Sequence, residues 1–122
     1  MPKILIVEDE LALVRALKAK LVGADFDVSV AYDGEEAKNA VRKKLPDLIL
    51  LDILLPKLSG IEYLVYLKKS VKFKSVPVLI LSNYSGEEII KQAMEAGAAD
   101  YLIKSNTSLE EVIRHVNKIL KK

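Results

Sequence analysis

Five short apolar runs divide the chain, and most of them end at a polar or charged residue. The runs cover residues 3–7, 27–32, 47–51, 77–82 and 99–104. Those at 47–51 and 77–82 are almost continuously apolar, whereas 27–32 (DVSVAY) alternates. Continuous runs of this length are typical of parallel strands covered on both faces. The pattern therefore predicts five strands, with 27–32 at an edge of the sheet or half-exposed.

Helical patterns fill the intervals between these runs. Leu13, Leu17 and Leu21 recur every fourth residue, which places them on one face of a helix. Gly97 is a plausible helix stop, and Ser108 with Glu111 three residues later has the spacing of a capping box. We therefore predict helices over 11–22, 34–45, 60–70, 86–97 and 107–122.

Strict alternation of strands and helices predicts an α/β fold with a parallel sheet and helices on both faces. The length of 122 residues suits one domain, spanning residues 1–122. The expected architecture is a flavodoxin-like, doubly wound (βα)5 fold with strand order 2-1-3-4-5. We see no internal repeat or linker, and the initial Met and helical end favour a stand-alone protein, although excision from a longer regulator stays open.

Composition narrows the classes of function. The chain contains no cysteine, which excludes thiolate metal sites and thiol nucleophiles. A net charge of +2 is too small to argue for direct nucleic-acid binding. Acidic residues follow the first apolar run directly, so the N-terminal sequence does not have the pattern of a signal peptide. No apolar stretch reaches membrane-spanning length. A soluble cytoplasmic protein without a membrane partner is the simplest interpretation.

Chemically useful side chains follow four of the five predicted strands. Glu8 and Asp9 follow the first strand, Asp52 the third, Ser82 ends the fourth, and Lys104 ends the fifth. Ligands of open α/β sheets bind outside the carboxyl ends of the strands. If the first strand is central, these groups converge on one pocket there.

Three neighbouring carboxylates repel one another unless a cation intervenes. Mg²⁺ prefers oxygen ligands and typically uses one or two carboxylates together with phosphate oxygens. Carboxylates also attack phosphorus to give an aspartyl phosphate. With Lys104 as a second counter-charge and the Ser82 hydroxyl as a donor, the set can form and hold a phosphoryl group on Asp52.

The chain resembles a response-regulator receiver domain, the phospho-acceptor module of two-component signalling. IVEDE, LILLDILLPKLSG, PVLILSN and GAADYLIK carry the resemblance, in that order, over essentially the whole chain. The resemblance implies that Asp52 is the phospho-acceptor, assisted by Ser82 and Lys104. It implies a Mg²⁺ (or Mn²⁺) site formed by Glu8, acting through water, by Asp9, by Asp52 and by the backbone carbonyl of Leu54.

The resemblance also implies a phosphorylation-dependent switch rather than a metabolic enzyme. Ser82 would move toward the phosphoryl group, and Tyr101 would turn into the vacated space. This would remodel the face formed by helix 86–97, strand 99–104 and helix 107–122. Expected partners are a sensor histidine kinase or phosphotransfer protein, a downstream effector that binds this face, and possible homodimers.

Three departures from the family pattern give further expectations. Ser105 replaces the usual proline after the lysine, and we expect the Lys104–Ser105 peptide to be cis, as is common in the family, at a cost of about 3 kcal/mol. Asn83 replaces a small residue and is expected to narrow access to the phosphoryl group or to bond to its oxygens. Leu54 and Tyr84 are poor bases for an attacking water, which predicts slow autodephosphorylation.

Alternative functions are less consistent with the sequence. A flavin-type cofactor binder needs a phosphate-binding loop where this chain has EDELAL. A phosphatase that forms an aspartyl phosphate usually needs a second acid at the position of Leu54. A receiver-like module that only binds partners, without phosphorylation, remains the alternative to the switch.

Overall fold

The computed structural model describes residues 1–121 and contains five strands, five α-helices and one short 3-10 helix. The strands are β1 (Lys3–Val7), β2 (Asp27–Ala31), β3 (Leu48–Leu51), β4 (Val78–Ser82) and β5 (Asp100–Ile103). The helices are α1 (Leu11–Gly23), α2 (Gly34–Lys43), α3 (Gly60–Lys69), α4 (Glu87–Glu95), η1 (Lys104–Asn106) and α5 (Leu109–Leu120). All ten predicted elements are present: β1 keeps its predicted bounds, α1 is one residue longer, and the others are a residue or two shorter at one or both ends. The last residue of the predicted helix 107–122, Lys122, lies outside the described residues.

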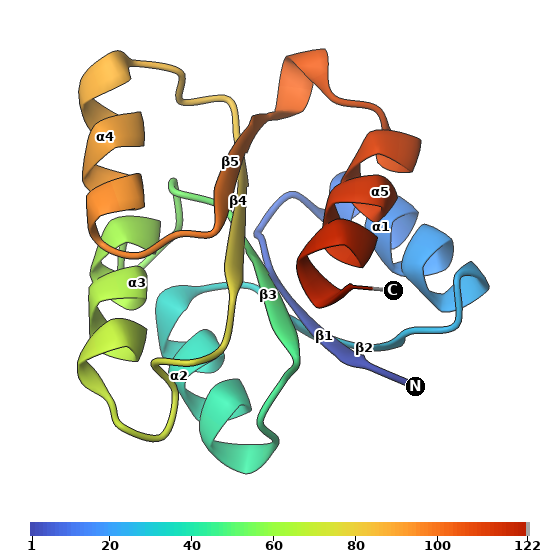
Figure 1. Ribbon diagram of the computed structural model, residues 1–122, viewed down its shortest axis with the longest axis horizontal. Helices are drawn as coiled ribbons and strands as arrows, with labels where there is room; N and C mark the ends of the chain where they lie inside the picture. Colours follow the sequence, from blue (N-terminus) through green and yellow to red (C-terminus); the bar gives the residue numbers. More distant parts are fainter. Residues whose placement is uncertain (122) are drawn as a thin grey trace.

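The strands form one parallel sheet in the order β2-β1-β3-β4-β5, as predicted. β1 lies between β2 and β3, and its last residue, Val7, is in register with Ala31 on one side and Leu51 on the other. β2 lies at the edge, which accounts for its alternating sequence. The carboxyl ends of the strands therefore meet along one edge of the sheet, toward the top of Figure 1.

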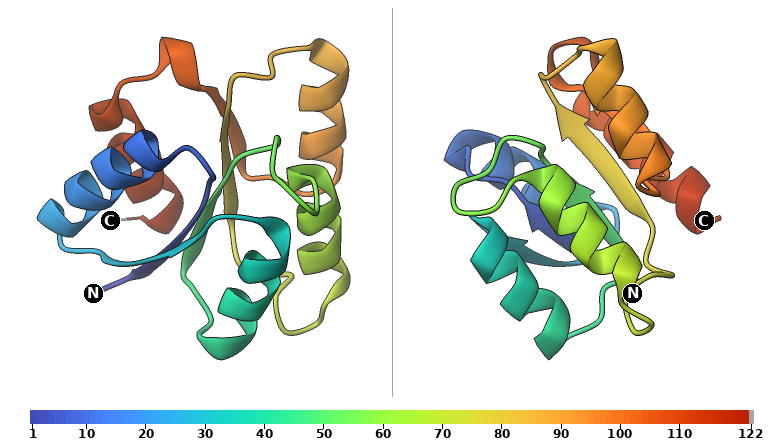
Figure 2. Two further views of the ribbon diagram at one scale, coloured as in Figure 1. Left: turned by 180° about the vertical axis from the view of Figure 1, so that it is seen from behind. Right: turned by 90° about the vertical axis from the view of Figure 1, so that its left-hand side faces the viewer.

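Helices cover both faces of the sheet (Figure 1). α2, α3 and α4 lie on one face and cross it side by side, whereas α1 and α5 lie on the other (Figure 2). Successive residues of each inner strand enter opposite cores: Leu5 packs with the α2–α4 side, and Ile6 packs with the α1–α5 side. Burial on both faces explains why these strands read as continuous apolar runs.

The helix ends follow local signals in the sequence. Ser108 caps α5 in the predicted capping box with Glu111, and Ser59 with Glu62 forms a second box at the start of α3. Gly97 has φ +109°, so it ends α4 with a conformation that favours glycine. Among the described residues, no helix is both long and apolar enough to cross a bilayer.

Candidate functional site

An acidic cluster lies at the carboxyl edge of the sheet, where β1 and β3 end. Val7 and Leu51 are in register, so the residues that follow them, Glu8 and Asp52, come out of the sheet side by side. Oxygen atoms of Glu8, Asp9 and Asp52 all lie within 4.8 Å of one another. Glu8 and Asp52 are only 3% and 6% exposed, whereas Asp9 faces solvent. The acids that the sequence predicted to converge therefore do so.

Lys104 supplies the positive charge of this cluster from the end of β5. Its Nζ lies 2.8 Å from Glu8 Oε1 and 3.1 Å from Asp52 Oδ2. Glu10, at the start of α1, lies 3.5 Å from the same nitrogen. Buried carboxylates need such a partner because the loss of water otherwise disfavours their charged form. The contact with Lys104 therefore explains how a buried carboxylate, Asp52, can directly follow the buried strand β3.

Burial and the contacts between Lys104 and the acids shift the pKa values of Glu8 and Lys104 in opposite directions. Burial raises the pKa of Glu8 to about 7, with the negative charge of Asp52 adding to the effect, although the hydrogen bond from Lys104 acts to lower it. Burial alone would lower the pKa of Lys104, but its hydrogen bonds to Glu8 and Asp52 outweigh burial and raise it. Lys104 therefore stays protonated while Glu8 holds a proton more readily than an exposed glutamate.

Asp52 is also fixed by its own loop. The Leu54 N–H donates to Asp52 Oδ1 at 3.3 Å, and the Gly60 N–H donates to the Ile53 carbonyl at 2.8 Å. A Cβ on Gly60 would lie 2.2 Å from the Asp52 carbonyl oxygen. The first turn of α3 can therefore approach the backbone of Asp52 only because residue 60 has no side chain.

Ser82 and Tyr101 lie beside this cluster on β4 and β5. Ser82 is fully buried, and its Oγ accepts a hydrogen bond from the Tyr84 N–H at 3.2 Å. The Tyr101 hydroxyl donates to the Tyr84 carbonyl, and the ring packs against the core on the α2–α4 side. Burial raises the pKa of Tyr101, and its interaction with Ser82 acts in the opposite direction. Both residues thus contact the β4–α4 loop through Tyr84.

The expected cis peptide at Lys104–Ser105 is wrong. Every peptide bond of the described residues is trans. Without proline the cis form is costly. The trans chain instead continues into η1, which is followed by Thr107. The Thr107 N–H donates to the Lys104 carbonyl at 3.3 Å, and the Thr107 Oγ1 donates to the Ile103 carbonyl at 2.7 Å.

Two contacts were not anticipated from the sequence. Glu10 joins the ion pairs of Lys104, and the acidic run Glu8-Asp9-Glu10 was the only signal for it. The side chain of Asn83 does not simply line the pocket, because its Oδ1 accepts a hydrogen bond from the Ser105 N–H at 2.9 Å. A side-chain contact to a backbone group 22 residues away leaves no periodic trace in a sequence.

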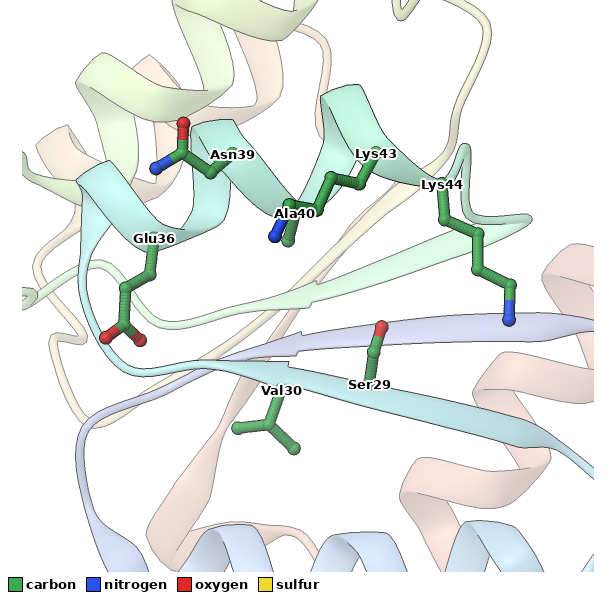
Figure 3. Close-up of a pocket in the computed structure, with 7 residues that line it drawn as sticks. All are labelled: Ser29, Val30, Glu36, Asn39, Ala40, Lys43 and Lys44. Atoms are coloured by element: carbon green, nitrogen blue, oxygen red, sulfur yellow. The ribbon is translucent and has the colours of Figure 1, made fainter.

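A hollow in another part of the surface does not coincide with the acidic cluster. This cavity, of about 520 Å³, opens between α2 and the edge strand β2 (Figure 3). Its lining residues are Ser29, Val30, Glu36, Asn39, Ala40, Lys43 and Lys44. Three of the polar side chains are already engaged: Glu36 accepts from the Tyr32 N–H, Asn39 accepts from Arg42, and Lys44 pairs with Asp27. The grouped charges and buried carboxylates make the strand-end cluster the better candidate for chemistry.

The donor set of the cluster fits a divalent cation. Three carboxylates offer hard oxygen ligands within one ion's reach, and the exposed Asp9 leaves a side open to water. Lys104 contacts two of the three acids and so neutralises part of their charge. An acidic site of this kind is compatible with Mg²⁺ binding.

Comparison with known proteins points to one family. The family model for the response regulator receiver domain matches residues 4–117. The alkaline phosphatase synthesis transcriptional regulatory protein PhoP of Bacillus subtilis is 39% identical over 120 residues, which are 98% of this chain and 49% of that protein. The response regulator PleD of Caulobacter vibrioides is 37% identical over 102 residues, which are 84% of this chain and 22% of that protein. The chain thus spans about a fifth to a half of the length of these curated relatives.

Solved structures agree. The receiver domain of the Francisella response regulator 1452 superimposes with a TM-score of 0.90 at 33% identity, covering 99% of this chain and 98% of that one. The BeF3-activated receiver domain of Klebsiella pneumoniae RstA gives a TM-score of 0.90 at 28% identity, covering 98% of this chain and 99% of that one. Together with the parallel sheet and its acidic carboxyl edge, these matches show that the chain belongs to the response-regulator receiver domains of two-component systems.

Proposed function

We propose that this protein is a phospho-accepting switch in a two-component phosphorelay, with Asp52 as the residue that becomes an aspartyl phosphate. The observation that carries the proposal is the contact of one ammonium, Lys104, with two buried carboxylates at the end of the sheet. Such a cluster costs free energy to bury, and a purely structural role gives no reason for three acids at one point.

The transfer follows from the position of Asp52. A carboxylate oxygen of Asp52 attacks phosphorus, forming a P–O bond while the bond from phosphorus to the donor breaks. The leaving group is an imidazole nitrogen when the donor is a phosphohistidine, and acetate when the donor is acetyl phosphate. Lys104 balances charge on the phosphoryl oxygens, and the Ser82 hydroxyl donates a hydrogen bond to one of them. The protein is a regulatory switch that assists only its own phosphorylation and dephosphorylation.

Asp9, Asp52 and the Leu54 carbonyl would hold Mg²⁺ (or Mn²⁺), with Glu8 acting through a water molecule. When bound, the ion supplies positive charge to the phosphoryl oxygens and offsets repulsion among the acids. The exposure of Asp9 leaves its carboxylate accessible to an ion that enters from solvent.

Phosphorylation would be transmitted through the β4–α4 loop. A rotation of Ser82 toward a phosphoryl group would alter the hydrogen bond that its Oγ accepts from the Tyr84 N–H. The Tyr84 carbonyl also accepts from the Tyr101 hydroxyl. A shift of this loop therefore changes the support of Tyr101 on β5. The face formed by α4, β5 and α5 would then present a different surface to a downstream effector or a second copy.

The proposed phosphodonor is a sensor histidine kinase or a phosphotransfer protein. We propose cytoplasmic action by a single domain spanning the chain, with effects on nucleic acid or membrane only through partners. Leu54 and Tyr84 are 60% and 45% exposed and carry no group that activates water, so loss of the phosphoryl group should be slow. Loss within seconds would contradict that part of the proposal.

Beryllofluoride, a phosphoryl mimic, provides the test. Two-dimensional amide NMR with Mg²⁺ should show saturable shifts at Ser82, Tyr84 and Tyr101 in the wild type and none in Asp52→Asn. Removal of Mg²⁺ by a chelator should reverse them. Absence of shifts in the wild type would favour the alternative, a receiver-like module that binds partners without phosphorylation.

A further inference from the structure

We propose that Asn83 is a positioning residue that holds Lys104 over Asp52 through the backbone of Ser105. The proposal rests on the proposed function for its activity readout, but the geometry that it describes can be measured separately. Asn83 follows Ser82, the last residue of β4, and Ser105 follows Lys104, the first residue after β5. Ser82 and Ile103 are in register, so the two loops start side by side.

The hydrogen bond joins the first residue after β4 to the second residue after β5. Asn83 Oδ1 accepts from the Ser105 N–H at 2.9 Å. Ser105 lies in the short helix η1, and the first N–H groups of a helix have no partner within it. Asn83 thus caps η1 from a neighbouring strand, a role for which a small side chain at position 83 is too short.

Lys104 is the residue whose placement depends on this cap. Its ammonium contacts three carboxylates, at 2.8 Å from Glu8, 3.1 Å from Asp52 and 3.5 Å from Glu10. A lysine side chain loses conformational entropy when it is held in these contacts. A fixed backbone at Lys104 reduces this entropy cost. Thr107, which follows η1, donates hydrogen bonds to the carbonyls of Ile103 and Lys104. Asn83 accepts a further hydrogen bond from the Ser105 N–H.

The same hydrogen bond links Lys104 to the loop that carries Ser82. A shift of the β4–α4 loop toward a phosphoryl group would move Asn83 and, through Ser105, the base of Lys104. The two groups that contact the phosphoryl oxygens would therefore move together rather than independently. Asn83 and Ser105 are both exposed, so water competes for this bond and the expected effect is modest.

The first test is the rate of phosphorylation by acetyl phosphate at saturating Mg²⁺. Asn83→Ala should slow the reaction by about three- to tenfold. Ser105→Ala keeps the backbone N–H and should react at the wild-type rate. In a Lys104→Met background, Asn83→Ala should cause no further slowing. An equal slowing in both backgrounds would overturn the proposal, because Asn83 would then act on the phosphoryl group directly.

The second test needs no phosphoryl transfer. The ¹H–¹⁵N signal of the Lys104 ammonium should be resolved in the wild type and Ser105→Ala, and broadened or shifted toward free lysine in Asn83→Ala. The Ser105 amide proton should exchange with solvent faster in the same variant. An unchanged ammonium signal in Asn83→Ala would overturn the positioning role. A wild type that takes up no phosphoryl group would contradict the proposed function, and the ammonium signal alone would then decide the role of Asn83.

Discussion

The ammonium of Lys104 lies 3.1 Å from a carboxylate oxygen of Asp52, although 52 residues separate them in the sequence. Parallel topology creates this contact, because β3 and β5 end at the same edge of the sheet with β4 between them. The same lysine contacts Glu8 from the end of β1. Three strands therefore contribute to one cluster, in which a single lysine neutralises part of the charge of several acids.

Replacing Lys104 by Met removes the charge and keeps most of the apolar stem. Glu8 and Asp52 would then be buried without a counter-charge, which should lower the free energy of unfolding by about 3 kcal/mol or more. Mg²⁺ should recover more stability in Lys104→Met than in the wild type, because a cation meets unopposed carboxylates there. Urea unfolding with chelator and with Mg²⁺ measures both effects. Equal stabilisation of the two proteins by Mg²⁺ would mean that lysine and metal do not share the same acids.

Glu8 should make stability depend on pH near neutrality. Its pKa is raised from 4.5 to about 7 by burial, so the folded state binds a proton that the unfolded state releases. The stabilisation from protonated Glu8 is complete below about pH 4.5 and is lost as pH rises through about 7. Glu8→Gln cannot titrate there. Without Mg²⁺, the wild type should therefore lose as much as about 3 kcal/mol relative to Glu8→Gln over this range. Parallel pH–stability curves for the two proteins would contradict this.

Gly60 should tolerate no side chain. The new Cβ of Gly60→Ala would lie 2.2 Å from the Asp52 carbonyl oxygen and 2.6 Å from the Ile53 Cα, both backbone atoms that cannot rotate away. We expect a loss of about 2–4 kcal/mol in the free energy of unfolding, together with weaker Mg²⁺ binding because the Asp52 loop is displaced. Gly23 is the matched control, since nothing lies within 4 Å of its Cβ position. Gly23→Ala should be neutral or stabilise by up to about 1 kcal/mol. Similar losses for both variants would show that space beside Asp52 is not the cause.

Most of the fold could be predicted because periodicity and strand ends are local signals. Continuous apolar runs identified the inner strands. The order of the strands then placed Glu8, Asp52 and Lys104, which follow β1, β3 and β5, at one edge of the sheet. The trans peptide at Lys104–Ser105 and the bond from Ser105 to Asn83 could not be predicted. Both depend on how two loops from different strands meet, which single-residue patterns do not encode.

Tyr101 should carry the signal from the phosphoryl site to the face formed by α4, β5 and α5. Its hydroxyl and ring both contact groups next to Ser82, through the Tyr84 carbonyl and the core. In Tyr101→Ala, beryllofluoride should still shift the amide signals around Asp52 but no longer those of α4 and α5. Tyr101→Phe, which keeps the ring, should retain part of the response. Full response at α4 and α5 in Tyr101→Ala, or effector binding that still depends fully on phosphorylation, would show that another residue transmits the change.

The central claim is that Asp52 accepts one phosphoryl group in a metal-dependent reaction. Intact mass spectrometry of the wild type and Asp52→Asn, after incubation with acetyl phosphate and Mg²⁺, tests it most directly. We expect a single added phosphoryl group on the wild type, none on Asp52→Asn, and none when a chelator is present. An adduct of equal yield on Asp52→Asn, or no adduct on a wild type that also fails to bind beryllofluoride, would contradict it.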